Sequence, residues 1–202
     1  YIPFDYSYNV LQSLDKDAIV FTYGDNDTFP LWYMQDVAGI RRDVRVVNLS
    51  LGQTGWYIDQ LKNRDPWGAK RLPLSFTDES LQVDESDPKA LSPEYGEAQE
   101  VTVTVRPEIM KKYTDNPGFI QSGAMRFLFV GSGEGQENGS GKKVYFIGNQ
   151  HKLVKDIVQQ THFERPVYFS AGGNENYCGL VDYLRWEGLA LRVCPVPQRQ
   201  MG

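Results

Sequence analysis

The chain has 202 residues, a length that suits one ordinary globular domain. Hydrophobic residues make up 41% and charged residues 23% of the sequence, which excludes a mainly disordered or collagen-like chain. No apolar run approaches the roughly 18 residues that a membrane-spanning helix needs. The net charge of −5 argues against a nucleic-acid partner, because such a surface needs a basic stripe.

The first residue and the cysteines bear on the context of the chain. It begins at Tyr1, with neither an initiator methionine nor a signal peptide, so we expect a piece of a longer protein. Cys178 and Cys194 are too few for a disulfide framework or a four-ligand zinc site. They form one bridge or stay free, and the default expectation is a small buried thiol at each position.

The first 63 residues alternate between helical and extended patterns. Apolar side chains at helical spacing mark the helices, and short β-branched or aromatic runs mark the strands. Helices are expected over 6–14, 28–38 and 54–61, and strands over 18–23 and 44–49. Short connections between these elements predict right-handed βαβ units on a parallel sheet.

The alternation is interrupted after residue 63 and resumes near residue 150. A polar, proline-containing stretch precedes predicted strands at 101–105, 125–130 and 143–147. The glycine-rich link 131–141 is expected to be a long, mobile hairpin loop. The last patterns predict a helix over 152–160, a strand over 166–170, a short helix around 180–186 and a strand over 189–193.

Together these patterns predict a single α/β domain over 1–202. We expect a Rossmann-like, three-layer fold with a mainly parallel sheet. Its body would comprise 1–63 and 149–202, and a β-rich insertion would occupy 64–148.

The segment 24–30, Gly-Asp-Asn-Asp-Thr-Phe-Pro, is the sharpest local feature. It lies between a predicted strand and the next helix, which is where open α/β sheets bind ligands. We therefore take Asp25, Asn26, Asp27 and Thr28 as candidate ligand-binding residues. Asp25 and Asp27 are also a candidate Mg²⁺ or Mn²⁺ site, because closely spaced carboxylates share divalent cations through their oxygens.

A purely structural role would explain the same residues. Asp27 or Thr28 suits the N-cap of the following helix, and aspartates satisfy backbone donors of turns without any ligand. Two aspartates at a helix N-terminus also repel phosphate unless a metal lies between them. The segment thus has a capping interpretation, with ligand or cation binding as the alternative.

The loop after the second predicted strand would face this segment if the two strands are neighbours. Asn48, Ser50, Gln53 and Thr54 could form a polar rim there, and we add Asn48 and Ser50 to the candidate ligand-binding residues. The structural alternative is an ordinary surface turn with Thr54 as a helix cap.

His151 and His162 flank the predicted helix at 152–160 and are separated by about three helical turns. They would not meet at one site, so we expect capping or exposure instead of general base catalysis. No serine has the surroundings of a nucleophile elbow and no Cys–His pair is indicated. The sequence thus identifies no catalytic residue.

Aromatic residues make up 13% of the chain. Trp32, Tyr33, Trp56 and Tyr57 fall on two early predicted helices, and Trp186 lies near the last one. Some of them belong to the core. A surplus of exposed aromatic side chains on one helix face would instead form a surface that docks a partner domain or the membrane surface of a parent protein.

Two blocks of the sequence resemble a known family. The first contains AIVFTYGDNDTFPLWY at 18–33 and RDVRVVNLSL at 42–51, and the second begins with RPVYFS at 165–170. They closely resemble the soluble carboxy-terminal region of a family of large bacterial multi-pass membrane proteins of unknown function. That family is similar to protein O-mannosyltransferases of the polytopic glycosyltransferase clan. The resemblance covers about 1–62 and 150–197, and 64–148 does not align.

The resemblance implies a parent protein whose membrane-embedded half holds the transferase active site. This chain would be its extramembrane accessory domain, binding a substrate or partner and inactive alone. The implied partners are the membrane-embedded half and a glycan or lipid-linked sugar. The implied location is the periplasmic side of the inner membrane. No catalytic assignment of the family carries over onto the segment 24–30.

Two other functions remain open from the residues themselves. An autonomous metal-dependent enzyme would act on a nucleotide sugar or phosphate ester through Asp25 and Asp27. A structural module would instead dock against membrane helices through its aromatic faces.

Overall fold

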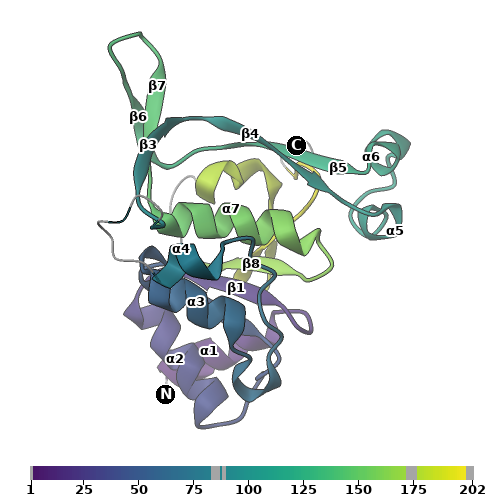
Figure 1. Ribbon diagram of the computed structural model, residues 1–202. Helices are drawn as coiled ribbons and strands as arrows, with labels where there is room; N and C mark the ends of the chain where they lie inside the picture. Colours follow the sequence, from purple (N-terminus) through teal and green to yellow (C-terminus); the bar gives the residue numbers. More distant parts are fainter. Residues whose placement is uncertain (1, 83–86, 88–89, 172–176, 199–202) are drawn as a thin grey trace.

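The computed structural model describes residues 2–82, 87, 90–171 and 177–198 (Figure 1). Its α-helices are α1 (Ile2–Gln12), α2 (Asp25–Asp36), α3 (Gly55–Asn63), α4 (Asp78–Gln82), α5 (Pro107–Met110), α6 (Pro117–Ser122) and α7 (Asn149–Thr161). Its strands are β1 (Ile19–Thr22), β2 (Arg45–Asn48), β3 (Glu94–Glu97), β4 (Gln99–Thr104), β5 (Ala124–Phe129), β6 (Ser132–Glu137), β7 (Lys143–Ile147), β8 (Val167–Ser170), β9 (Leu184–Glu187) and β10 (Ala190–Val193). Short 3-10 turns are η1 (Leu51–Gln53), η2 (Pro66–Gly68), η3 (Tyr177–Gly179) and η4 (Val181–Tyr183).

The central sheet is mixed, with five strands in the order β2-β1-β8-β10-β9. β1 pairs in parallel with β2 and with β8, whereas β10 pairs antiparallel with β8 and with β9. The smaller sheets, β3-β7-β6 and β4-β5, are antiparallel throughout. The expectation of a mainly parallel, Rossmann-like three-layer fold is therefore wrong, and the fold is a mixed α/β fold with several antiparallel pairings.

The antiparallel part of the central sheet arises because the chain forms a hairpin after β8 instead of a helical crossover. Gly188 lies between β9 and β10 with φ +58°, a left-handed conformation that glycine adopts without a Cβ clash. Across this two-residue turn Ala190 pairs with Glu187. The short helix expected around 180–186 is also wrong, since that segment contains only the turn η4 before β9 begins.

The parallel part of the sheet forms where the apolar runs predicted it. Every residue of β1 and β2 is buried, as expected for strands covered on both faces. The helix α2 connects them as a crossover, and their register pairs Thr22 with Asn48. This register brings the carboxyl ends of the two strands to the same edge of the sheet.

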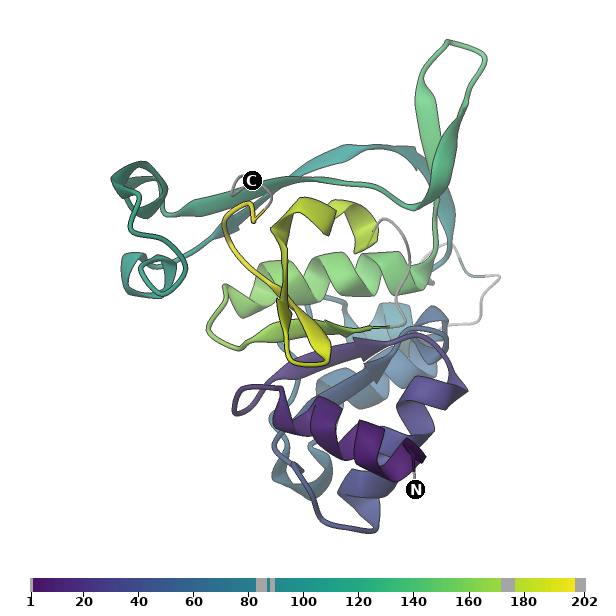
Figure 2. The same ribbon diagram turned by 180° about the vertical axis from the view of Figure 1, so that it is seen from behind.

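Two hydrophobic cores lie on opposite faces of the central sheet, because successive strand residues point to opposite sides. On one face, α1 and α2 pack against Val20 and Val46. On the other, α3 and α7 pack against Phe21 and Val47, and the ribbon β4-β5 lies over α7 (Figures 1 and 2). No helix in the described part of the chain is both long and apolar enough to cross a membrane.

The segment between α3 and α7 forms an extended ribbon with two different ends. The helices α5 and α6 lie at one end of β4-β5, and the hairpin β6-β7 projects from the other (Figure 2). Because 132–137 is a paired strand, the expected long loop over 131–141 is wrong. The sequence did not reveal this strand because it is rich in glycine and glutamate and lacks an alternating apolar face.

Candidate functional site

The carboxyl ends of the parallel strands are tied to the first turn of α2 by a buried polar network. The hydroxyls of Thr22 and Thr28 share a hydrogen bond of 2.7 Å. Asn48 Nδ2 donates to Thr28 Oγ1 at 2.9 Å, and Asn48 Oδ1 accepts from the backbone N–H of Leu51 at 2.9 Å. Thr22, Thr28 and Asn48 are all buried, so this network fixes α2 and the loop after β2 against β1.

Asp27 is the most heavily bonded of the candidate residues. Its Oδ1 accepts from the N–H of Gly24 at 2.9 Å, and its Oδ2 accepts from the N–H of Tyr23 at 3.0 Å. Its Oδ2 also accepts from the hydroxyl of Ser170, at the end of β8, at 2.6 Å. The helix begins at Asp25 with Gly24 as its N-cap, earlier than the expected start near Thr28. Asp27 thus closes the helix start from its third position, instead of capping it as the first residue before the helix.

Asp25 and Asn26 lie outside this network and are exposed. They border an open hollow of about 490 Å³ that is shared with Pro3 and Tyr6 of α1. Tyr6 lines this hollow together with Asp25 and Asn26, and burial and the negative charge of Asp27 raise its pKa. The hollow beside the candidate segment therefore lies on the side of α1 and not on the side of the sheet.

An aromatic groove continues from this hollow along α1 and α2. A second open hollow, of about 710 Å³, shares Pro3, Phe29 and Pro30 with the first. We call the two hollows together the α1–α2 groove; it is lined by Pro3, Phe4, Asp5, Tyr6, Asp25, Asn26, Phe29, Pro30 and Tyr33. Phe29 and Tyr33, one helical turn apart, are 51% and 52% exposed. The groove thus combines exposed aromatic rings with a carboxylate and an amide at one end.

Ser50 lies at a different place from the other candidates. Its hydroxyl donates to the backbone carbonyl of Tyr23. With Gln53, Gln150 and His151 it lines a separate pocket of about 130 Å³, the volume of roughly four water molecules. The six candidate residues are thus divided among a buried network, an open groove and a small pocket.

The part of the chain that is described contains no group of three or more His, Cys, Asp or Glu side chains placed to hold a metal ion. Three of the roughly four acceptor positions of the Asp27 carboxylate are used by hydrogen bonds within the protein, which leaves one position, on Oδ1. The proposed Mg²⁺ or Mn²⁺ site at Asp25 and Asp27 remains a prediction.

The histidines and cysteines take structural positions. Nδ1 of His151, in the first turn of α7, accepts from the N–H of Gly148 at 2.9 Å, and burial lowers the pKa of this imidazole. His162 is exposed where α7 ends. Both cysteines are buried, and burial raises the pKa of Cys178 to about 12 and that of Cys194 to about 11. The expectations of helix-end histidines and buried thiols are confirmed.

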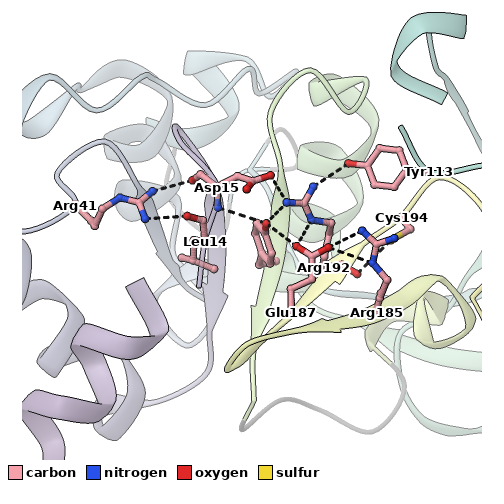
Figure 3. Close-up of polar contacts among 9 residues, drawn as sticks. Leu14, Asp15, Arg41, Tyr113, Arg185, Glu187, Arg192 and Cys194 are labelled. Atoms are coloured by element: carbon pink, nitrogen blue, oxygen red, sulfur yellow. Dashed lines mark hydrogen bonds and ion pairs between the residues drawn. The ribbon is translucent and has the colours of Figure 1, made fainter. Parts of the chain in front are cut away.

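A second polar cluster, on the side of the sheet near the end of α1, is centred on Arg192 (Figure 3). Nε of Arg192 donates to Glu187 at 2.6 Å, Nη1 donates to Tyr113 at 3.3 Å, and Nη2 contacts both Asp15 and Tyr168. Burial alone lowers the pKa of Arg192, but its hydrogen bond to Asp15 and the neighbouring tyrosines raise it overall. Because its donors are used within the protein, we assign the cluster a structural role.

The sequence missed the contribution of α1 to the groove. Phe4 and Tyr8 are spaced by one helical turn and are 43% and 42% exposed. This spacing was visible, but only the packing of α1 beside α2 brings Phe4 next to Phe29. Among the aromatics that the sequence singled out, Tyr33, Trp56 and Trp186 are exposed, Trp32 is partly buried and Tyr57 is buried.

Comparison with known proteins places the chain in a family. Neither the curated proteins nor the solved structures yield a match. A match with the family described as TMEM260-associated domain 2 covers 3–124 and 141–202. It includes most of 64–148, the segment that did not align in the sequence resemblance, and leaves out only 125–140 within the matched span. The chain belongs to the TMEM260-associated domain 2 family.

Proposed function

We propose that the chain is an extramembrane accessory domain of a membrane-bound glycosyltransferase-like protein, and that its α1–α2 groove binds a sugar. The family match and the resemblance to the carboxy-terminal region of O-mannosyltransferase-like membrane proteins support the accessory role. In this proposal the partner is the membrane-embedded half of a bacterial parent protein. The domain lies on the periplasmic side of the inner membrane and acts as one unit over 1–202.

The observation that carries the sugar-binding proposal is the chemistry of the groove. A sugar ring has apolar C–H faces and a rim of hydroxyl groups. The exposed rings of Phe4, Phe29 and Tyr33 offer flat surfaces for the C–H faces. Asp25 and Asn26, at the end of the groove, offer carboxylate and amide groups to the hydroxyls.

The buried network behind the groove supports the same proposal, because binding groups work best on rigid supports. Asp27 and Thr28 hold the first turn of α2 through Ser170 and Asn48. Phe29 follows directly and is therefore presented from a fixed turn. Asp27 in this account positions the groove and does not contact the sugar.

The test is a calorimetric titration of this chain with α-mannobiose, with glucose and galactose disaccharides, and with a short-chain polyprenyl phosphate mannose in detergent micelles. Empty micelles are the blank. We expect saturable binding of at least one sugar. Replacing both Phe29 and Tyr33 by serine should weaken it at least about fivefold, since each aromatic contact contributes about 0.5–1.5 kcal/mol. Trp186→Ser, an exposed aromatic on β9, is the matched control and should bind as the original chain does.

Two results would overturn the sugar-binding proposal. One is the absence of a saturable heat with every sugar at millimolar concentration. The other is equal binding of loaded and empty micelles that is lost in the Phe29/Tyr33 variant. That second result would instead support the structural alternative, in which the aromatic groove docks on apolar surface.

A further inference from the structure

A separate cavity of about 450 Å³ lies beside β2, which is an edge strand of the central sheet. The helices α2 and α3 flank it, and the turn η2 contributes Pro66 and Trp67. Its volume is within the range of small-molecule sites in proteins, about 300–1,000 Å³. Three tryptophans, Trp32, Trp56 and Trp67, line it. None of the residues that line this cavity belongs to the α1–α2 groove.

Arg45 is the residue of this cavity that calls for an explanation. It is only 4% exposed, and its Nη2 donates to the carbonyls of Gln60 at 3.2 Å and Leu61 at 3.4 Å. Its Nη1 is buried and has no hydrogen-bond partner among the described residues, although the charge of Asp65 partly offsets the lowering of its pKa by burial. No carboxylate in the described part of the chain lies within ion-pair distance of it. A buried charge without a counter-ion is unfavourable, and an anion in the cavity would relieve it.

A second arginine adds to the uncompensated positive charge. Arg165 donates from Nε to the carbonyl of Asp17 at 2.9 Å and from Nη1 to that of Arg71 at 2.9 Å, and its Nη2 is buried without a hydrogen-bond partner among the described residues. Burial lowers the pKa of Arg165 to about 10; the charge of Asp17 opposes this lowering, and the positive charge of Arg45 contributes to it. The charge of Arg165 thus adds to that of Arg45 at this edge of the sheet, and Asp17 offsets part of it.

The tryptophan walls are held in place although they face solvent. Nε1 of Trp67 donates to Asp36 Oδ1 at 2.6 Å, and the guanidinium of Arg42 lies 5.0 Å from the centre of its ring. Trp67 also has φ +58°, a backbone conformation that a bulky residue rarely adopts. Yet Trp67 is 58% exposed and Trp56 is 59% exposed. These rings are fixed in position and still present apolar surface to the cavity.

We propose that this cavity binds a small organic oxyanion, a phosphate or carboxylate group on a flat apolar body, with Arg45 anchoring the anionic group. The apolar body packs between Trp56 and Trp67. Arg42 also lines the cavity and adds a second positive charge; the carboxylate of Asp36, which accepts from Nε1 of Trp67, remains negative and offsets part of it, so Arg45 is the anchor. This proposal is independent of sugar binding in the α1–α2 groove, and either one can fail without the other.

The chain offers a natural reporter for this site. It contains four tryptophans, of which Trp32, Trp56 and Trp67 line the cavity and Trp186 lies on β9. In a Trp186→Phe background every tryptophan therefore reports on the cavity. The probes are phenyl phosphate and phenylacetate, with benzyl alcohol as the neutral compound of similar shape and inorganic phosphate as the anion without an apolar body. The relative affinity of the first two identifies which oxyanion the cavity prefers.

We expect saturable fluorescence changes with phenyl phosphate or phenylacetate, and at least about tenfold weaker binding of benzyl alcohol. Arg45→Met should remove the preference for the anionic probes, whereas Trp67→Leu should weaken all aromatic probes alike. Arg185→Met, which removes a guanidinium outside the cavity, is the matched control and should leave the affinity for every probe unchanged.

Should Arg45→Met fail to fold, the same comparison is made on the Trp186→Phe protein from its melting temperature. Anionic probes should then raise the melting temperature more than benzyl alcohol does, because a ligand stabilises the state that it binds. Equal affinity for phenyl phosphate, phenylacetate and benzyl alcohol would overturn the proposal. So would the absence of any saturable change at millimolar concentrations of the anionic probes.

Discussion

The hydroxyl of Ser170 donates a hydrogen bond of 2.6 Å to Oδ2 of Asp27 and so joins the end of β8 to the first turn of α2. The two residues are 143 positions apart in the sequence. The same carboxylate accepts the N–H groups of Tyr23 and Gly24, which follow β1. One side chain therefore fixes the helix start relative to two neighbouring parallel strands, directly behind the α1–α2 groove.

Asp27→Ala should destabilise the protein by about 1–3 kcal/mol, because it removes a helix-start interaction and leaves buried donors without a partner. Asp25→Ala is the matched control. Asp25 is an exposed residue in the same turn, so its removal should change the free energy of unfolding by no more than about 0.5 kcal/mol. Urea denaturation of the three proteins measures the difference. Equal destabilisation by the two substitutions would contradict the assigned roles.

Arg192→Met should destabilise the protein by about 2–4 kcal/mol. The substitution removes a buried guanidinium that bonds Glu187, Tyr113, Asp15 and Tyr168, and leaves the carboxylates and phenols of the cluster without it (Figure 3).

The control for Arg192→Met is Arg106→Met. Arg106 forms ion pairs with Glu108 and Glu164, but its side chain is 57% exposed, so its removal should cost less than about 1 kcal/mol. Thermal unfolding of both variants tests the contrast. If Arg106→Met is the more destabilising change, the Arg192 cluster does not hold this side of the sheet together.

Stability should decline as the pH falls below about 6.5, the ordinary pKa of histidine in an unfolded chain. Burial lowers the pKa of His151 in the folded protein, and its Nδ1 must stay unprotonated to accept the N–H of Gly148. The unfolded chain therefore binds more protons than the folded protein in this range, so the free energy of unfolding falls as the pH falls.

The substitution His151→Gln isolates this effect, because glutamine keeps an acceptor at the same helix position and does not titrate. The free energy of unfolding of the original protein should fall relative to that of this variant between pH 8 and pH 5, as followed by urea denaturation. His162→Gln, at the exposed end of α7, should show the same dependence of the free energy of unfolding on pH as the original protein. A pH dependence carried by His162 instead would refute the assignment to His151.

Both cysteines should react slowly with a thiol reagent at pH 8, because the thiolate is the reactive form and burial keeps each pKa well above this pH. The same thiols should react at once in concentrated urea. Ser140→Cys, on the exposed turn between β6 and β7, is the control and should contribute one rapidly reacting thiol. Rapid reaction of two thiols in the native original protein would show that Cys178 and Cys194 are accessible.

The local sequence pattern predicted those helices and strands whose side chains are buried in the same way in parallel and antiparallel sheets. The apolar runs at β1, β2 and β8 and the periodic segments at α1, α2, α3 and α7 were predicted, with shifts of a few residues at their ends. Strand direction was not predicted, because an apolar run reads alike in parallel and antiparallel sheets. The one local signal for the reversal was Gly188 between two short runs, and it was hidden by the assumption of a helix before it.

The binding role of the candidate residues stays a prediction, and the sequence did not indicate that they divide among a buried network, an open groove and a small pocket. The polar residues after β1 and β2 do lie at one edge of the sheet, as parallel pairing requires. Ser170 was not recognised, because its contact with Asp27 depends on β8 pairing with β1 far along the chain. Arg45 was visible as a charge inside an apolar run, but that its buried Nη1 has no hydrogen-bond partner among the described residues depends on the folded packing.

The most direct measurement for the central proposal is an NMR titration of the aromatic carbon-bound protons of this chain with α-mannobiose and with the polyprenyl phosphate mannose. If the groove binds the sugar, signals of Phe4, Phe29 and Tyr33 should shift together and saturate, while those of Trp186 stay in place. Groove signals that remain unshifted at saturating sugar, or that move only with empty micelles, would contradict it.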